Sequence, residues 1–426
     1  MYYGHHCYRG AKIQDWRQED MEHTIWQGDS AICERKGRQK FELYQTWMAD
    51  LTTVQNNPCL IPDLPNDIAK LCLAKVPRLN LMKLRVVCTS WKHLIESREF
   101  YDLRYAVGYA EPWILVLAEK PSNSPFKAFC TQNNKWHELP AFPYSIQTSQ
   151  WQGFSCVGIG CNLLLMGGMH FEALPQQGKV SGDVYIYNAS TNKWSKGSSM
   201  NTPRSWFAAT VIGNYVYVAG GQGKDRFLNS VEVYDLEHDS WSYVPSMILI
   251  RSSCRGLALK GRFWVIGGEI VRNQYGGKLM RGSAEVYDPE TCSWTMIPEM
   301  WLDTEKVPGP TTVLCGKLVS IHRSKVMMYE NDGNCWCHIG YLPDAGMQVN
   351  SYPRFGFAMQ SIDDKLYIVG GVRASRQCQH CAQTLNTTEV CDLSFQGGIL
   401  RICNWQSRAS MDGCEGNVLA SAIIRI

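Results

Sequence analysis

The sequence lacks the features of a secreted or membrane-spanning protein. No apolar run among its 426 residues approaches the roughly 18 residues that a spanning helix needs. The first residues, MYYGHHCYRG, contain neither an apolar stretch nor a small-residue cleavage site, so we expect no secretory signal. We therefore expect a protein of the cytoplasm or the nucleus, without a membrane partner.

An excess of charge of one sign is also missing. Lysine and arginine together number 42, and aspartate and glutamate number 39, which leaves a formal net charge of +3. Because the two signs are interspersed, the sequence predicts no extended basic or acidic surface. We therefore expect no nucleic acid among the partners of this protein.

Cysteine is abundant, but its spacing does not indicate a disulfide framework. The 18 cysteines are scattered, and several, such as Cys156, Cys254 and Cys315, fall in apolar segments that resemble strands. In such segments a free cysteine behaves as a small buried hydrophobic residue. We therefore expect reduced thiols.

The sequence does contain a repeat with a period near fifty residues. In each repeat a tryptophan follows an apolar or aromatic residue, and Gly-Gly pairs at 167–168, 220–221, 267–268 and 370–371 precede most of these motifs. Five pairs have a spacing of seven residues, namely Phe129/Trp136, Tyr187/Trp194, Tyr234/Trp241, Tyr287/Trp294 and Tyr329/Trp336. A sixth pair, Cys391 and Trp405, is stretched by an insertion. Such a period indicates a repeat architecture.

The clearest repeat predicts four short strands. Residues 207–212 and 215–219 are expected to form a hairpin, followed by strands over 230–234 and from Trp241 onward. The Gly-Gly pair at 220–221 suits a place where the backbone has a positive φ or where a bulky group approaches closely. Four strands per repeat around an axis indicate a β-propeller.

These motifs resemble the kelch repeat, and the best matches are VEVYDLEHDSW at 231–241 and AEVYDPETCSW at 284–294. The resemblance covers roughly residues 112–426 and implies a mainly β fold with a six-bladed kelch β-propeller, which we assign to residues 105–426. Two repeats depart from the pattern, because Ala118-Glu119 and His322-Arg323 stand where Gly-Gly is expected. The first repeat lacks its first strand. We expect residues 416–426 to supply that strand and close the ring.

Residues 60–95 predict three short helices before the propeller. Turn residues between Asp63 and Asp67 start the first helix, Pro77 ends it, and helices over 79–84 and from 89 to 94 follow. A segment of this size has little stability alone and exposes apolar surface. We therefore expect it to dock on a helical partner.

The same segment resembles an F-box, which we assign to residues 59–104 as a small three-helix domain. The resemblance implies that its helices bind a Skp-type adaptor of a cullin ubiquitin ligase. The expected adaptor-binding residues are Leu64, Pro65, Ile68, Val76, Pro77, Val87, Cys88 and Trp91. The alternative is that Leu64, Ile68, Val87 and Trp91 form only a small core. Residues 1–58 would be an N-terminal extension, either disordered or partly helical near 41–51.

The sequence predicts no catalytic residue, metal site or cofactor. Plant specifier proteins have a kelch propeller with an iron site spaced Glu-x3-Asp-x3-Cys; Asp288 and Cys292 fit half of it, but Ala284 replaces the glutamate. The Cys-x2-Cys motif at 378–381 would supply part of a zinc site, but no second pair lies at the spacing of a zinc finger.

Three arginines recur at one position of the repeat. Arg204, Arg251 and Arg354 each stand three residues before a first strand. Equivalent positions of successive blades lie around one rim, so these arginines are candidates for binding an acidic part of the target. The alternative is that each arginine pairs locally and holds neighbouring blades together. The loops after the Gly-Gly pairs are long and dissimilar, and we expect them to carry target specificity.

These features predict a substrate-recognition subunit of an SCF-type E3 ubiquitin ligase. Its F-box would bind a Skp-type adaptor and through it a cullin, and its propeller would bind a target protein that the sequence does not identify. The alternative is a kelch scaffold that binds proteins outside any ligase.

Overall fold

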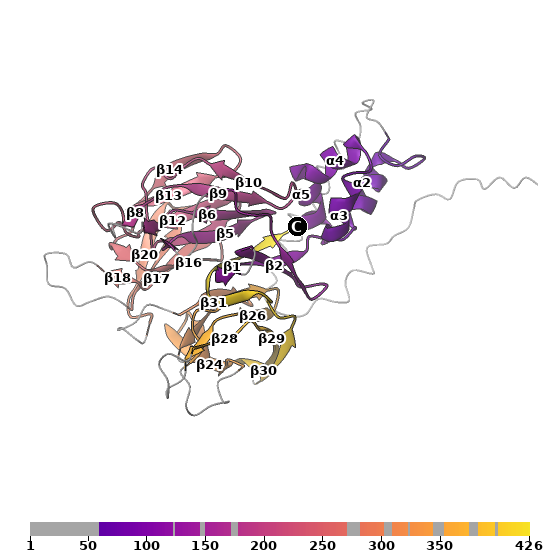
Figure 1. Cartoon of the computed structure of the whole chain (residues 1–426). Helices are drawn as coiled ribbons and strands as arrows, with labels where there is room; N and C mark the ends of the chain where they lie inside the picture. The colour runs from indigo at the N-terminus through magenta and orange to yellow at the C-terminus, as the bar shows by residue number, and fades with distance from the viewer. Residues whose placement is uncertain are drawn as a thin grey trace, which may run out of the picture. The chain divides into compact units, whose positions relative to one another are not determined.

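Four helices precede the sheets in the part of the chain that the computed structural model describes. They are α2 (Asn66–Ala74), α3 (Arg78–Leu84), α4 (Thr89–Glu96) and α5 (Arg98–Ala106) (Figure 1). The described residues are 59–426 without 122–123, 145–149, 172–177, 271–281, 302–308, 323, 344–352, 375–381 and 397–398. The expected N-terminal extension, residues 1–58, thus lies outside them. None of the described helices is long and apolar enough to cross a bilayer.

The helix α5 corrects the expectation of three helices. Prolines stand at the N-caps of α2 and α3, where their restricted φ is tolerated. The unexpected helix starts at Ser97, whose hydroxyl accepts a hydrogen bond from the backbone N–H of Phe100. Glu99 in its first turn and Arg104 in its last turn complement the helix dipole.

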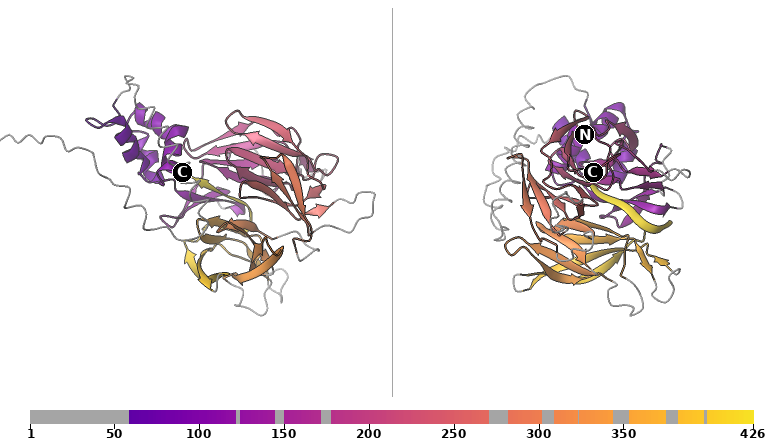
Figure 2. Two further views of the ribbon diagram at one scale, coloured as in Figure 1. Left: turned by 180° about the vertical axis from the view of Figure 1, so that it is seen from behind. Right: turned by 90° about the vertical axis from the view of Figure 1, so that its left-hand side faces the viewer.

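The other described residues form six four-stranded antiparallel sheets, which we number as blades 1 to 6 (Figure 2). From the inner to the outer strand, blade 1 consists of β31 (Cys414–Arg425), β1 (Pro112–Pro121), β2 (Phe126–Cys130) and β3 (Lys135–Glu138); blade 2 of β5 (Ser155–Ile159), β6 (Asn162–Met166), β9 (Val184–Asn188) and β10 (Lys193–Gly197); and blade 3 of β11 (Ala208–Ile212), β12 (Tyr215–Ala219), β13 (Val231–Asp235) and β14 (Ser240–Val244). Blade 4 consists of β16 (Arg255–Leu259), β17 (Arg262–Ile266), β19 (Ala284–Asp288) and β20 (Ser293–Ile297); blade 5 of β21 (Thr311–Leu314), β22 (Lys317–His322), β23 (Lys325–Glu330) and β24 (Cys335–Tyr341); and blade 6 of β25 (Ala358–Ile362), β26 (Lys365–Val369), β29 (Thr388–Gln396) and β30 (Ile399–Arg408). Short strands in the loops form three smaller sheets, namely β4 (Trp151–Gln152) with β7 (Met169–Phe171) and β8 (Gly178–Val180), β15 (Arg251–Ser252) with β18 (Glu269–Ile270), and β27 (Val372–Ala374) with β28 (Ala382–Thr384).

The inner strands arrange these sheets in a ring. They contact one another in the order β31, β5, β11, β16, β21 and β25, and β25 in turn contacts β31. The strand β31 pairs antiparallel with β1, from Pro112 opposite Arg425 to Pro121 opposite Cys414. The inner strand of blade 1 therefore comes from the far end of the chain, and the sheets form a β-propeller.

The tryptophans that mark the repeat link successive blades. In each outer hairpin the tryptophan lies directly opposite the aromatic or apolar residue of its pair, including Trp405 opposite Cys391. Each indole N–H donates to a carbonyl at the end of the outer strand of the preceding blade or just beyond it. The acceptors of Trp194, Trp241, Trp294, Trp336, Trp405 and Trp136 are the carbonyls of Pro140, Ser198, Pro245, Met300, Tyr341 and Ala409. The bond from Trp136 to Ala409 joins blade 1 to blade 6 and is a second closure of the ring.

Candidate adaptor-binding and target-binding surfaces

The two ends of the blades differ in sequence and in surroundings. One end carries the Gly-Gly pairs at 167–168, 220–221, 267–268 and 370–371, and we call it the diglycine face. The other end carries the hairpin turns, such as 160–161, 189–192, 213–214 and 236–239, and we call it the turn face. The antiparallel register separates them, because Ile212 pairs with Tyr215 at one end of blade 3 and Ala208 with Ala219 at the other.

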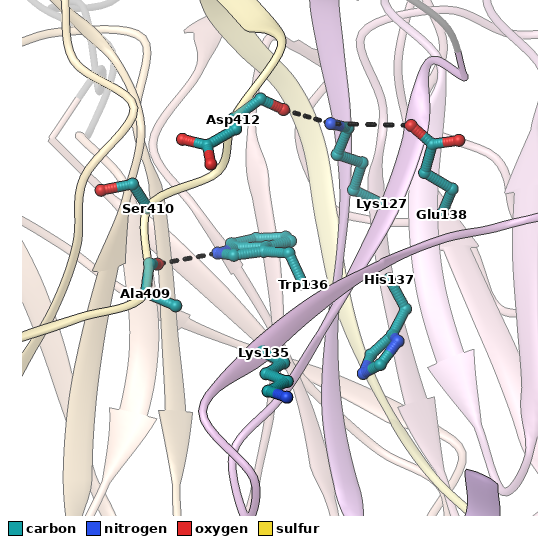
Figure 3. A pocket seen from close by; sticks show the side chains of 8 residues that line it. All are labelled: Lys127, Lys135, Trp136, His137, Glu138, Ala409, Ser410 and Asp412. Carbon is teal, nitrogen blue, oxygen red and sulfur yellow. Dashed lines mark hydrogen bonds and ion pairs between the residues drawn. The ribbon is translucent and has the colours of Figure 1, made fainter.

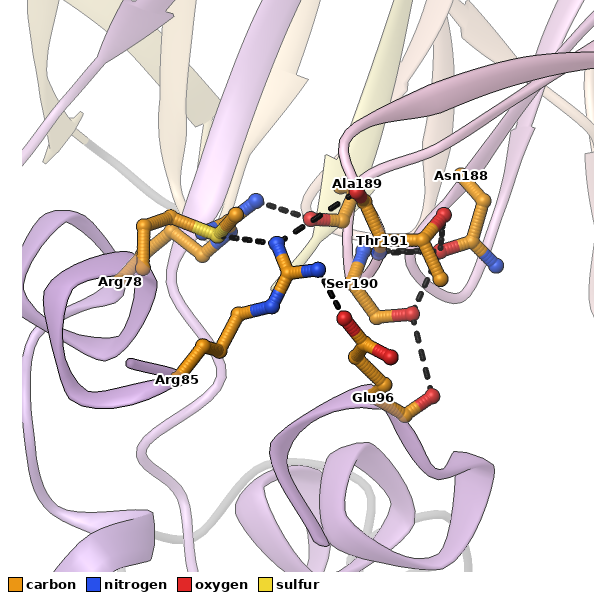
Figure 4. A network of polar contacts seen from close by, with 8 residues as sticks. Arg78, Arg85, Glu96, Asn188, Ala189, Ser190 and Thr191 are labelled. Atoms are coloured by element: carbon orange, nitrogen blue, oxygen red, sulfur yellow. Dashed lines mark hydrogen bonds and ion pairs between the residues drawn. The ribbon is translucent and has the colours of Figure 1, made fainter. Parts of the chain in front are cut away.

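The helices contact the turn face of blades 2 and 3, and Figure 4 shows the contacts with blade 2. The contacts run from Arg78 to the carbonyl of Ala189, from Arg85 to the carbonyl of Thr191, from the hydroxyl of Ser190 to the carbonyl of Glu96, and from Arg98 to the carboxylate of Glu237. All four propeller residues lie in the turns between the third and fourth strands. The F-box segment therefore lies at the end of the blades opposite the diglycine face.

A buried arginine joins the helices to blade 1 as well. Arg104 is 1% exposed, and its guanidinium donates to the carbonyls of Ala74 and Val76 at 2.6 Å. It also donates to the carbonyl of Ile426 at 3.2 Å and to the Glu111 carboxylate at 3.4 Å. Burial lowers the pKa of Arg104, and Glu111 opposes this effect. Because one side chain contacts the end of α2, the linker after it and the residue that follows the closing strand, the helices are packed against blade 1.

The eight expected adaptor-binding residues divide into an exposed and a packed group. Pro65, Ile68, Pro77, Val87 and Cys88 are exposed, and the exposed fractions of Ile68 and Val87 are 42% and 58%. Leu64, Val76 and Trp91 are half-buried, with Val76 and Trp91 packed against the core cluster below the helices.

The alternative of a small core therefore describes Trp91 but not Ile68 or Val87. The Trp91 indole N–H donates to the carbonyl of Leu60 at 2.6 Å, so this ring holds the start of the domain in place. Two further apolar residues, Leu79 and Val86, are exposed, and Val86 reaches 86%. Val86 could have been predicted from the sequence, because it lies beside Val87 in the turn between α3 and α4.

The Gly-Gly pairs have positive φ and are approached closely by neighbouring backbone, as the sequence predicted. Gly220 and Gly221 have φ values of 67° and 94°, which favour glycine. A Cβ atom on Gly221 would lie 2.5 Å from the carbonyl oxygen of Ser205. The segment before the first strand thus packs directly on the second glycine, and the other three pairs repeat this geometry.

The three rim arginines are buried, which corrects the expectation that they bind the target. Arg204, Arg251 and Arg354 are at most 5% exposed. Each guanidinium pairs with a glutamate of the third strand of its own blade and donates to the carbonyl of the first glycine. The glutamates are Glu232, Glu285 and Glu389, at 2.5, 2.8 and 3.0 Å; the carbonyls belong to Gly220, Gly267 and Gly370. Burial lowers the pKa of Arg204, and Glu232 opposes it.

Two of these arginines also join neighbouring blades through their backbone. The carbonyl oxygens of Arg204 and Arg251 accept hydrogen bonds from Gly168 and Gly221 of the preceding blade. The local-pairing alternative is therefore the correct description of these residues. In blade 2, Trp151 takes the place of the arginine, and its indole N–H donates to the carbonyl of Gly167.

The two residues that match half of the iron motif of the specifier proteins, Asp288 and Cys292, have structural roles. Asp288 pairs with Arg262 at 2.8 Å, and Cys292 has a φ of 51° in a hairpin turn. Asn134, Asn192, Asp239 and Asn334 have positive φ at the same position of other blades. The described residues contain no group of three or more metal-binding side chains, while the Cys-x2-Cys motif at 378–381 lies outside them.

A cavity of about 350 Å³ opens beside the junction of blades 1 and 6 (Figure 3). It is lined by Lys127, Lys135, Trp136, His137, Glu138, Ala409, Ser410 and Asp412. Two of these groups already serve the closure of the ring, since Lys127 donates to the carbonyl of Asp412 and Trp136 to that of Ala409. The lining carries both signs of charge and has no evident preference for one class of ligand.

The diglycine face exposes aromatic rings and an arginine that the sequence analysis missed. Phe227 and Phe355 are 38% and 48% exposed, Trp206 is half-buried, and Arg255 is exposed. Backbone bridges place the two phenylalanines there, because Phe227 pairs with Gln222 and Phe355 with Val372, just after the Gly-Gly pairs. Trp and Arg are enriched at the energetic centres of protein interfaces.

Comparison with known proteins supports the two-part organisation. A family model of the F-box domain matches residues 61–103, and the KLHDC2/KLHL20/DRC7 Kelch-repeats domain matches residues 118–329. The F-box/kelch-repeat protein At1g80440 of Arabidopsis thaliana is 30% identical over 67% of this chain and 82% of its own length. This chain belongs to the F-box/kelch-repeat protein family.

Further relatives of this F-box/kelch-repeat protein agree. The Arabidopsis F-box/kelch-repeat protein At1g16250 is 27% identical over 73% of this chain and 83% of its own length, and At2g44130 is 32% identical over 59% and 68%. Among solved structures, the chain titled "Structure of YjhT" aligns with a TM-score of 0.50 at 16% identity, covering 66% of this chain and 91% of its own. That likeness concerns the fold alone. At the level of the family, an F-box joined to kelch repeats is the architecture of a non-catalytic SCF substrate receptor.

Proposed function

We propose that this chain is the substrate-recognition subunit of an SCF-type E3 ubiquitin ligase. The F-box helices bind a Skp-type adaptor and through it a cullin, and the propeller binds the target protein. The chain performs no covalent chemistry and acts by holding the target near the catalytic module of the ligase. The observation that carries the proposal is that the helices contact the turn face, which leaves the opposite ends of the same strands to a target.

Exposed apolar side chains on the F-box segment support adaptor binding. Ile68, Leu79, Val86 and Val87 are each at least 38% exposed, although burying such side chains is favourable. Exposed apolar groups of this kind mark protein interaction sites when they gather on one domain. These four residues, rather than the half-buried Trp91, are therefore the best sites for testing the adaptor contact.

The contacts of Arg104 and Arg78 support a fixed geometry for the proposed complex. Both guanidiniums are buried between the helices and the propeller and donate to carbonyls. A rigid connection is useful to a ligase subunit, because the target then keeps one orientation relative to the adaptor. Proximity assists a reaction only when orientation is also maintained.

Co-purification with a Skp-type adaptor tests the proposal. The double variant Ile68→Asp/Val87→Asp is expected to lose the adaptor, because it places two charges on the apolar contact surface. The matched control is Tyr243→Asp, at an outer strand of blade 3, where the side chain is also 58% exposed. Both variants are expected to melt near the temperature of the wild type, since exposed substitutions cost little stability.

Failure of the wild type to co-purify with the adaptor would refute the proposal, and undiminished binding by the double variant would refute the contact surface assigned to Ile68 and Val87. A second measurement separates a ligase subunit from a scaffold. When the protein is overexpressed, the half-life of a captured target is expected to fall for the wild type and to stay unchanged for the double variant.

A further inference from the structure

Arg255 is the first residue of β16, the inner strand of blade 4, at its diglycine end. It pairs with Ile266, which directly precedes Gly267-Gly268. Residues at the same register in three other blades are Ser155, Ala208 and Ala358. A long cation therefore stands where these three blades have small side chains.

The charge of Arg255 has no partner among the described residues. No ion pair or side-chain hydrogen bond involves it, in contrast to Arg251, which pairs with Glu285 at 2.8 Å. The residue is exposed to solvent, while the protein around it partly desolvates the guanidinium and lowers its pKa. An unpaired guanidinium that is partly shielded from water binds an anion more strongly than a fully solvated one does.

An aromatic residue, Trp206, lies on the same face, and its backbone carbonyl contacts the segment that leads into Arg255. The N–H of Ser253, two residues before Arg255, donates to the carbonyl of Trp206 at 2.7 Å. The Trp206 ring lies over Gly153, where an added Cβ would be 2.7 Å from the ring. Trp206 has a φ of 51°, and Gly153, Ser253 and Gly356 have positive φ at the same position of other blades, so the repeat itself fixes the backbone that presents this ring.

We propose that the diglycine face binds an acidic segment of the target, in which a carboxylate pairs with Arg255 and apolar atoms pack on Trp206. The inference rests on the proposed function, because it assumes that the propeller holds a protein. The planar guanidinium matches a carboxylate through two parallel hydrogen bonds. The three buried rim arginines do not compete for this carboxylate, since each already has its own glutamate.

Selection of random short peptides displayed on phage, with the full chain immobilised, tests this inference. We expect the wild type to enrich peptides rich in Asp and Glu. Arg255→Ala is expected to bind those peptides at least about tenfold more weakly, which corresponds to about 1.4 kcal/mol. The variant should fold, because two other blades carry alanine at this position. Arg255→Glu is expected to enrich basic peptides instead.

The matched control is Arg262→Ala, on the turn face of the same blade, where the side chain is 57% exposed. It should keep the affinity of the wild type for the acidic peptides. Enrichment of peptides without acidic residues, no enrichment, or equal binding by Arg255→Ala and the wild type would each overturn the inference. Adaptor co-purification is measured separately with the same variants. Its failure in the wild type would refute the ligase proposal and leave the peptide result to be judged alone.

Discussion

Removal of residues 417–426 should abolish the cooperative unfolding of the propeller. The deletion takes away most of β31 and the residue after it, and with them Ile424 and Ile426, which are 1% and 3% exposed. Burying an isoleucine side chain contributes roughly 1.5–3 kcal/mol, so these two account for about 3–6 kcal/mol. A whole domain is typically stable by only about 5–15 kcal/mol. The deletion also leaves the inner edge of β1 unpaired, and such edges promote aggregation.

Thermal melts followed by circular dichroism would check this prediction. The point variant Ile424→Ala should keep a cooperative transition but lose about 2–5 kcal/mol, because it creates a cavity between strands. The control Phe395→Ala, at a side chain that is 75% exposed, should change the free energy of unfolding by less than about 0.5 kcal/mol. A cooperative melt of the truncated chain near the wild-type temperature would refute the role assigned to β31.

Three further predictions follow from single residues. Gly221→Ala should lower the free energy of unfolding by about 2 kcal/mol or more, because φ is 94° and the Cβ would meet a carbonyl. Gly213→Ala, in an open turn, should lower it by about 1 kcal/mol. Chemical denaturation measures both. Trp136→Phe removes the hydrogen bond that joins blade 1 to blade 6 and should lower stability by about 1 kcal/mol; an unchanged denaturation midpoint would contradict it. In native protein at pH 8, iodoacetamide should modify the exposed Cys88 and spare Cys254, since burial raises the pKa of Cys254 to about 11 and only the thiolate reacts.

The tryptophan spacing predicted the outer hairpins because a fixed turn length forces a fixed separation. Tyr234 and Trp241 face each other across the hairpin, and the Tyr234 hydroxyl donates to Asp239 in the turn. The insertion between Cys391 and Trp405 keeps this opposition, since β29 and β30 simply become longer. Local geometry of this kind can be predicted from the sequence.

The direction in which a side chain points was harder to predict from the sequence. The position of Arg204 on the rim follows from the repeat, but its burial depends on Glu232 in another strand. A glutamate recurs two residues before the aromatic position wherever such an arginine occurs, at 232, 285 and 389, and this joint recurrence is the signal that favours local pairing. Blade 2 has Trp151 and Tyr185 at the two positions, and their rings are in contact at 6.0 Å.

The exposure of Arg255 and the helix α5 were harder to predict for a different reason. Arg255 differs from the residues at the same position of other blades, and this difference becomes visible only when the register of the strands is known. The helix α5 has its apolar residues interrupted by charges, and its Ser97 cap is a weak signal alone. Its burial depends in part on contacts with residues far away along the chain, such as that of Arg104 with Ile426.

The pairing of β31 with β1 has a consequence for synthesis. A ribosome makes β1 long before β31, so the nascent propeller remains an open arc with an unpaired inner edge on its first blade. Contacts so distant along the chain make folding slow and expose the incomplete protein to aggregation. Because Arg104 also contacts Ile426, the junction below the F-box is completed only when the ring is. Under the proposed function, adaptor recruitment would then favour finished molecules over nascent ones.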